Sequence, residues 1–375
     1  MATLTDTRNT ARSEANSQIR SGATLLAHVT PNWFGAVMGT GIVATAAAGL
    51  PVGTAALEPF AVAMWLVAAG LLVVVASAFV GHWMHHPENA RGYARHPMMG
   101  HFYGAPAMAL LTVGAATLLV GRDVVGDHPA VWIDAVLWTV GTLLGVATSV
   151  CLPYSMMTRR SDEPRVAMPC WLMSVVPPMV SATTGALLVG HIPAGQARLT
   201  MLCGCYGLFG LSLFLGMITM TLIYSRAIQD GPPAGAAAPT FWITLGLIGQ
   251  SVTAANLLGN ASQGVFTDEQ AYISQGLRVF GIGYGMAMAG FGVAMFALAV
   301  AVTVRAVRRR MPFAITWWSF TFPVGTCVTG LAALGKVLHA APIEALSVVL
   351  FVALVGAWTL VASMTVVHRR AVLAP

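Results

Sequence analysis

The chain has 375 residues, of which 57% are hydrophobic and 9% charged, and its mean hydropathy is +0.75. Soluble domains carry about 25% charged residues, so this composition excludes an ordinary soluble protein and indicates a chain that lies largely in a bilayer. The formal net charge of +6 does not indicate nucleic-acid binding, because the arginines lie in short segments between hydrophobic runs and form no single basic face.

Ten hydrophobic runs are long enough to cross a bilayer. They predict an all-α integral membrane domain over 23–367, preceded by a disordered cytoplasmic tail (1–22) without the apolar core of a signal peptide and followed by a short cytoplasmic tail (368–375). The predicted spans are 32–50, 59–80, 98–120, 130–151, 169–190, 198–223, 240–259, 279–303, 313–333 and 343–366.

A proline with nearby aromatic residues opens every odd-numbered span. These prolines are Pro31, Pro97, Pro169, Pro239 and Pro312, which are 66, 72, 70 and 73 residues apart. A repeat of this size holds two membrane-spanning helices. The sequence therefore predicts five helical hairpins arranged with pseudo-five-fold symmetry around a central pore.

The basic residues predict the orientation. With the N-terminus inside the cell, 15 of the 19 lysines and arginines fall in cytoplasmic segments, and only Arg122, Arg198, Arg278 and Lys336 fall outside. Short cytoplasmic loops carry an excess of positive residues. We therefore expect a multi-pass protein of the plasma (inner) membrane with both termini in the cytoplasm.

Prolines also separate the odd spans from the even ones. Pro106, Pro177, Pro178 and Pro323 lie inside predicted odd spans, and none lies inside a predicted even span. An interior proline frees a carbonyl that lipid cannot pair. The odd helices are therefore predicted to be kinked inner helices, and the even helices to face lipid.

Small polar side chains recur along the odd spans at helical spacing, and they predict a pore lining. The alternative is that these residues only hydrogen-bond one helix to the next. The predicted lining residues are Thr40, His101, Ser174, Ser181, Thr184, Gln250, Thr253, Asn256, Ser319, Thr326 and Thr329.

The chemistry of this lining suits an anion. No Asp, Glu or Arg lies deep in an odd span, which argues against a proton relay or a cation pore lined by acids. Hydroxyls and amides can donate hydrogen bonds to an anion without holding it too tightly. We expect no metal or other cofactor and no enzymatic activity.

Histidines give a competing interpretation. His82, His85 and His86 have a spacing that places two rings on one helical face, as in a metal or haem pair. A histidine-ligated membrane redox protein is therefore the alternative function. His28 and His101, near the inner ends of spans one and three, are candidates for an anion contact or a pH sensor.

Two strings resemble one known family. HVTPNWFGAVMGTGIVA at 28–44 and WWSFTFP at 317–323 are similar to the tellurite-resistance/C4-dicarboxylate transporter family, which includes slow anion channels, malate permeases and sulfite efflux pumps. The likeness extends from about His28 to Val367, and the MGTGIV string looks closest to the sulfite pumps. The motif residues are Pro31, Trp33, Phe34, Gly39 and Gly41.

The resemblance implies ten helices in five hairpins and a homotrimer with one pore in each protomer. It also implies small inorganic anions or dicarboxylic acids as substrates, and Phe322 as an aromatic gate across the pore. The residues alone leave Phe322 open between a gate and a core side chain, and they leave open whether the protein is a channel or a proton-coupled carrier.

Overall fold

The computed structural model describes residues 26–158 and 166–368. Helices account for almost all of this part of the chain, and no strand occurs in it. The tails predicted at 1–22 and, apart from His368, at 368–375 lie outside the described residues. The prediction of an all-helical membrane protein is confirmed.

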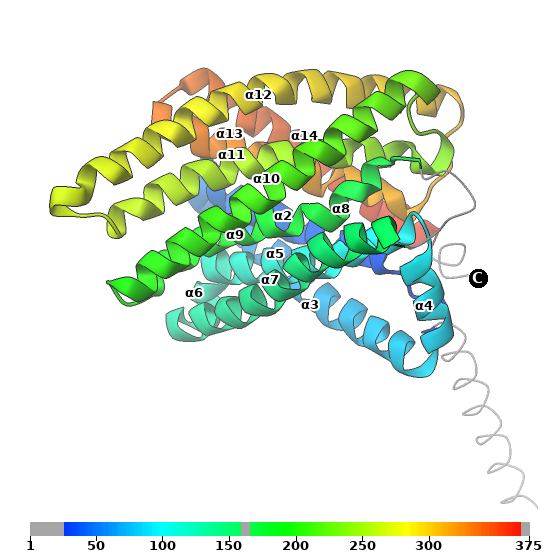
Figure 1. The fold of residues 1–375 in the computed structure, drawn as a ribbon, viewed down its shortest axis with the longest axis horizontal. Helices are drawn as coiled ribbons and strands as arrows, with labels where there is room; N and C mark the ends of the chain where they lie inside the picture. The colour runs from blue at the N-terminus through cyan, green and yellow to red at the C-terminus, as the bar shows by residue number, and fades with distance from the viewer. Residues whose placement is uncertain (1–25, 159–165, 369–375) are drawn as a thin grey trace, which may run out of the picture.

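The long helices fall into an inner and an outer set (Figure 1). The inner helices are α2 (Phe34–Gly49), α5 (Ala105–Ala116), α9 (Pro177–Leu188), α11 (Ile243–Ala261) and α13 (Phe322–Leu338). The outer helices are α3 (Thr54–His85), α7 (Asp127–Thr158), α10 (Gln196–Asp230), α12 (Ala271–Arg308) and α14 (Ala341–Val367). Shorter helices are α4 (Pro87–Arg95), α6 (Arg122–Val125) and α8 (Leu172–Val175).

The inner helices form a closed ring. Helix α2 contacts α5, α5 contacts α9, α9 contacts α11, α11 contacts α13, and α13 contacts α2 again. Each outer helix packs on the inner helix that precedes it, so the pairs are α2–α3, α5–α7, α9–α10, α11–α12 and α13–α14. In the described part of the chain, these contacts close the five inner helices into a ring and place one outer helix against each of them.

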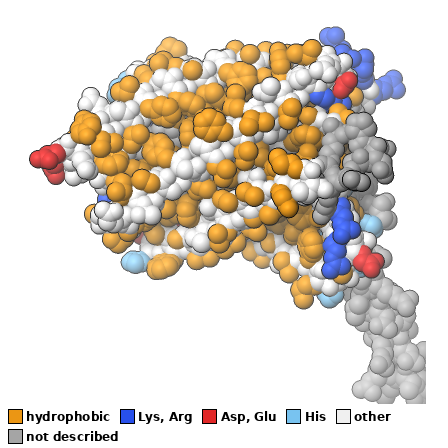
Figure 2. Space-filling model, in the orientation of Figure 1, with side chains coloured by type: hydrophobic (Ala, Val, Ile, Leu, Met, Phe, Trp, Pro, Cys, Tyr) orange, Lys and Arg blue, Asp and Glu red, His pale blue; other side chains and the backbone are white. Residues whose placement is uncertain are grey.

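Burial follows the predicted division between odd and even spans. The span that contains α11 has 94% of the residues of its most apolar stretch buried inside the molecule. In the span that contains α12, only 11% of the residues of the corresponding stretch are buried. Exposed hydrophobic side chains cover the middle of the surface, and Lys and Arg gather mainly at the end where α4 lies (Figure 2). This pattern is that of a protein whose outer helices face lipid.

The described helices include eight or nine candidates for the ten predicted spans. Eight helices of the described residues are long and apolar enough to cross a bilayer, and a ninth is counted if α8 and α9, which meet at 46°, form one bent span. The first predicted span corresponds to α2, whose 16 α-helical residues fall short of the roughly 20 that a straight span needs. Ten spans therefore stay a prediction.

The inner prolines begin helices. Pro106, Pro177 and Pro323 occupy the first turns of α5, α9 and α13, after a short 3₁₀ or α segment, and Pro178 follows Pro177. The prediction that these prolines lie inside continuous spans is therefore corrected. In the first turn of a helix a backbone N–H has no partner within the helix, so a proline there loses no hydrogen bond. The prediction that even helices lack prolines was also wrong: Pro59, the first residue of the predicted span 59–80, lies inside α3, and α7 extends past its predicted end at residue 151 to include Pro153.

Glycines set the close spacing of the inner ring. A Cβ on Gly39 would overlap the Thr321 side chain, and one on Gly41 would lie 2.9 Å from the Thr112 methyl group. Gly249 of α11 likewise lies against the backbone of α13. Small residues allow helices in a membrane to approach closely, which gives the two motif glycines a packing role.

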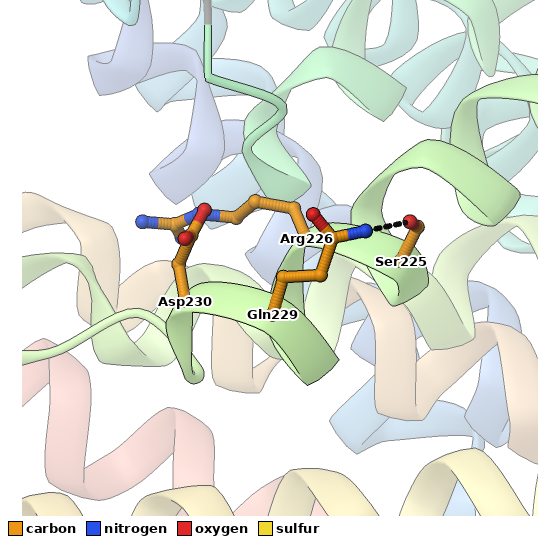
Figure 3. Close-up of polar contacts among 4 residues, drawn as sticks. All are labelled: Ser225, Arg226, Gln229 and Asp230. Atoms are coloured by element: carbon orange, nitrogen blue, oxygen red, sulfur yellow. Dashed lines mark hydrogen bonds and ion pairs between the residues drawn. The ribbon is translucent and has the colours of Figure 1, made fainter.

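Polar contacts mark the end of α10. Arg226 Nε lies 3.8 Å from Asp230 Oδ2, and Gln229 donates to Ser225 Oγ at 3.0 Å (Figure 3). The members of each pair are one helical turn apart. One ion pair and one hydrogen bond therefore connect polar side chains of the last turns of α10, beyond the apolar part of the helix.

Candidate functional site

The ring of inner helices encloses a cavity of about 210 Å³, which we call the large cavity. Every residue of its wall comes from the five inner helices or, for Leu119, from the π-helical turn after α5. Its members are Ile42, Thr45, Gly49, Thr112, Ala115, Leu119, Val180, Thr183, Thr184, Leu187, Gln250, Thr253, Leu257, Asn260, Phe322, Thr329, Ala333, Lys336 and Val337.

Six threonines line this cavity, and each hydroxyl lies 2.7 to 3.2 Å from a backbone carbonyl three or four residues earlier in its own helix. Four of them donate to that carbonyl, whereas Thr253 and Thr329 also share a hydrogen bond at 2.9 Å in which one of the two hydroxyls is the donor. The hydroxyl groups therefore present mainly oxygen lone pairs to the cavity. A threonine hydroxyl must rotate before it can donate a hydrogen bond to an anion. The threonines are Thr45, Thr112, Thr183, Thr184, Thr253 and Thr329.

Three other side chains supply polar groups to the wall. Gln250 is buried, and its Oε1 has no hydrogen-bond partner. Asn260 and Lys336 are exposed and lie toward the C-terminal ends of α11 and α13. The two amides and the ammonium group can therefore donate to an anion without first breaking a helix bond.

A second cavity of about 30 Å³, the small cavity, lies in the same ring nearer the start of the inner helices. Its polar residues are Asn32, Thr316 and Ser319. In four of the inner segments the residues of the small cavity precede those of the large cavity, and in the fifth the two sets meet at Phe322 and Pro323, so the two cavities follow one another along the axis.

Phe322 lines both cavities, and no other residue is shared by their walls. It is the first residue of α13 and only 4% exposed. Although the following Pro323 disfavours a helical backbone at Phe322, the residue is helical here because Pro323 fits the first turn of the helix. The ring thus lies at the boundary between the two cavities.

The predicted lining residues divide between the cavities and the helix contacts. Thr184, Gln250, Thr253 and Thr329 line the large cavity and Ser319 the small one. Thr253 and Thr329, from neighbouring helices, also approach each other to 2.9 Å between their hydroxyl oxygens.

Four other predicted residues bond between or within helices, away from these walls. Thr40 accepts from Trp358 Nε1 at 3.0 Å, and Thr326 donates to the Pro323 carbonyl at 2.7 Å. Asn256 donates to the carbonyls of Val252 and Gly281, and Ser181 donates to that of Pro177. Two of these contacts, from Trp358 to Thr40 and from Asn256 to Gly281, join one helix to another, and the others lie within a single helix.

His101 and Ser174 form a buried pair outside both cavities. His101 Nδ1 lies 3.1 Å from Ser174 Oγ, and the His101 ring stacks on Trp171 at 5.5 Å. Ser174 uses its single proton to donate to the Trp171 carbonyl at 2.7 Å, so His101 Nδ1 must carry the proton of the shared bond.

The motif aromatics pack at the start of α2. Pro31 begins a 3₁₀ turn, Trp33 is half-buried, and Phe34 meets Phe79 of α3 edge-to-face at 5.4 Å. These residues fix the beginning of the inner helix to its outer partner.

The clustered histidines have other contacts. His82 Nδ1 lies 2.7 Å from the Leu26 carbonyl oxygen, and its ring centre is 6.3 Å from that of His86. His28 Nδ1 lies 3.1 Å from the Tyr93 hydroxyl. Among the described residues, no group of three or more His, Cys, Asp and Glu side chains could hold a metal ion.

The sequence interpretation missed several residues of the large cavity. Thr45, Thr112 and Thr183 lay within predicted spans but outside the chosen stripes, whereas Asn260 was part of the predicted stripe of the seventh span. Lys336 was assigned to an outer loop, whereas α13 extends to Leu338. The continuing apolar pattern after residue 333 was the available signal.

The comparisons with known proteins agree with this architecture. Residues 28–366 match the SLAC1 family, described as voltage-dependent anion channels. The uncharacterized transporter MJ0576 of Methanocaldococcus jannaschii is 28% identical over 81% of this chain and 83% of the relative. The sulfite efflux pump SSU1 of Arthroderma otae is 24% identical over 90% and 89%. The chain therefore belongs to the SLAC1 family of voltage-dependent anion channels.

Proposed function

We propose that this protein passes small anions across the membrane along the axis of the inner ring, from the small cavity past Phe322 to the large cavity. The observation that carries the proposal is that Phe322 alone is shared by the walls of two cavities that follow one another inside five inner helices. An apolar ring at that point narrows the path and excludes water from it, as a hydrophobic gate does.

The proposal includes ten spans with pseudo-five-fold symmetry. The closed ring of contacts supports it, as does the packing of each outer helix on its own inner helix. Helix α2 together with its 3₁₀ turn (Pro31–Trp33) would form the first span. The basic end of the molecule, which includes Arg305 and Arg308 at the end of α12, would be cytoplasmic together with both termini.

The cavity walls favour an anion over a cation. Neither wall includes an Asp or Glu, whereas Lys336 lies at one end of the large cavity. The amides of Gln250 and Asn260 can donate to an oxyanion. Because the threonine hydroxyl protons are already used in hydrogen bonds within the protein, binding would be weak enough for release. Sulfite-like oxyanions and C4-dicarboxylates are the proposed substrates, in line with the printed name of the SSU1 relatives.

The test is flux in proteoliposomes. Purified protein would be reconstituted and loaded in turn with sulfite, malate, succinate, tellurite, nitrate or chloride, and efflux compared with that of protein-free vesicles. Protein-dependent efflux of at least one of these anions is expected. If no anion leaves faster than from empty vesicles at either sign of membrane potential, the proposed function is wrong.

A homotrimer with one path per protomer is part of the proposal and rests on the family resemblance. Light scattering of the detergent-solubilised protein, corrected for bound detergent, would give three times the chain mass of 39.1 kDa. A monomeric mass in several mild detergents would contradict the trimer but leave the path within each protomer untouched.

A further inference from the structure

A buried acid lies behind the wall of the large cavity. Asp134 of α7 is completely buried, and neither of its carboxylate oxygens has a hydrogen-bond partner. Burying a carboxylate without a donor costs several kcal/mol, so a group in this position stays neutral by keeping its proton. Asp134 lies in the predicted span 130–151, an even span, and is not among the predicted site residues.

Asp134 contacts the backbone of α5. A Cβ added to Gly114 would lie 2.5 Å from Asp134 Oδ1 and 3.2 Å from the Cβ of Leu137. The glycine therefore provides the space that the carboxyl group occupies, and any movement of α5 relative to α7 changes the surroundings of this carboxyl.

The same segment of α5 forms the cavity wall. Thr112 and Ala115, on either side of Gly114 in the sequence, line the large cavity. The π-helical turn Thr117–Gly121 follows directly and contributes Leu119 to the wall. Such turns are frequent at functional sites. One side of α5 thus contacts the acid and another side contacts the proposed path.

Few other ionisable groups surround the acid. Helices α5, α8 and α9 and the π-helical turn, all packed on α7, have no acidic or basic side chain, and Asp134 forms no ion pair with any described residue. The groups on the other packed elements and on α7 itself are Arg122 and Asp123 of α6, His101 and Tyr103 of the 3₁₀ segment before α5, and Asp127, His128, Cys151 and Tyr154 of α7.

We propose that Asp134 is a proton-binding site that controls the anion path. Asp134 is protonated in this conformation, in which Phe322 lies between the two cavities. It releases its proton to water when α5 and α7 separate enough to admit water or a donor. Protons bind more tightly to the conformation that excludes water from the carboxyl, so low pH stabilises the divided path and rising pH favours the open one. The link to transport rests on the proposed function.

The first test reads the proton directly. Infrared spectra of the purified protein near neutral pH should contain the C=O band of a protonated carboxylic acid. This band should be lost in Asp134→Asn and kept in Asp127→Asn, which removes an exposed acid from the same helix. Labelling the wild type with ¹³C-aspartate should shift the band, a result that does not depend on whether a variant folds. A wild type without such a band, or a band that persists in folded Asp134→Asn, would overturn the proton site.

The second test measures how anion transport depends on pH. Anion efflux from wild-type proteoliposomes should rise with pH, by up to about tenfold per pH unit where a single proton limits opening. Asp134→Asn should flatten this profile and Asp127→Asn should keep it. A profile shared by all three proteins would overturn the regulatory role. If the wild type moved no anion at all, the proposed function would fail while the infrared band still tested the proton site.

Discussion

Replacing Phe322 with alanine tests the proposed gate most directly. The ring borders both cavities, so its removal joins them without changing any charged group. In the wild type the ring must leave its preferred rotamer for an anion to pass, and a displacement of this kind costs of order 0.5–1.5 kcal/mol. Because about 1.4 kcal/mol is a factor of ten in rate, Phe322→Ala should raise anion efflux about two- to tenfold.

The stability of the Phe322→Ala protein distinguishes a gate residue from an ordinary core residue. Removing a fully packed phenylalanine costs about 3–5 kcal/mol on soluble-protein precedent. Phe322 has empty space on two sides, so fewer contacts are lost, and we expect a cost of less than about 3 kcal/mol. The variant should therefore keep the gel-filtration profile of the wild type.

The assay is efflux of a permeant anion from liposomes containing matched amounts of protein. Phe320→Ala is the control, since Phe320 lies two residues earlier, meets Trp242 and Trp317 edge-to-face, and lines neither cavity. The Phe320→Ala protein should be less stable than the wild type and should show no increase in anion efflux. Lower efflux from Phe322→Ala together with a poorer gel-filtration profile would show that the ring is core packing and would refute the gate.

Four further experiments test the remaining features. The cysteine introduced by Arg309→Cys should react with an impermeant reagent only from the cytoplasm, and the cysteine introduced by Asp127→Cys only from outside. Labelling of the Asp127→Cys protein from inside would contradict the orientation. Pro323→Ala should allow the break before α13 to become continuous helix and alter flux in a correctly assembled protein, whereas unchanged flux would make the break incidental. Gly39→Ala should lower stability by about 1–3 kcal/mol in thermal unfolding, because its methyl group overlaps Thr321; a stability equal to that of the wild type would show that the contact relaxes. Lys336→Gln should reduce anion flux at low ionic strength, with the difference shrinking in high salt; equal flux at all salt concentrations would exclude steering by this charge.

The sequence by itself determined the class of the protein and the order of its layers. Hydrophobic runs of span length, separated by short basic segments, are a property of local composition, and lipid permits only helices there. Small polar side chains at helical spacing along the odd spans indicated which helices lie inside. The proline argument for the same division did not hold, because the inner prolines begin helices and two outer helices also include a proline. The structure has the same inner and outer sets.

Only the tertiary structure decided which polar residues reach the axis. Thr326 and Thr329 are three residues apart, about 60° around the helix, and the sequence places both on one stripe. In the structure Thr329 lines the large cavity while Thr326 bonds to the Pro323 carbonyl. The rotation of a helix about its own axis is set by packing against both neighbours, and a break at a proline shifts this rotation midway. The burial of Asp134 against Gly114 likewise depends on two helices meeting, which no local pattern contains.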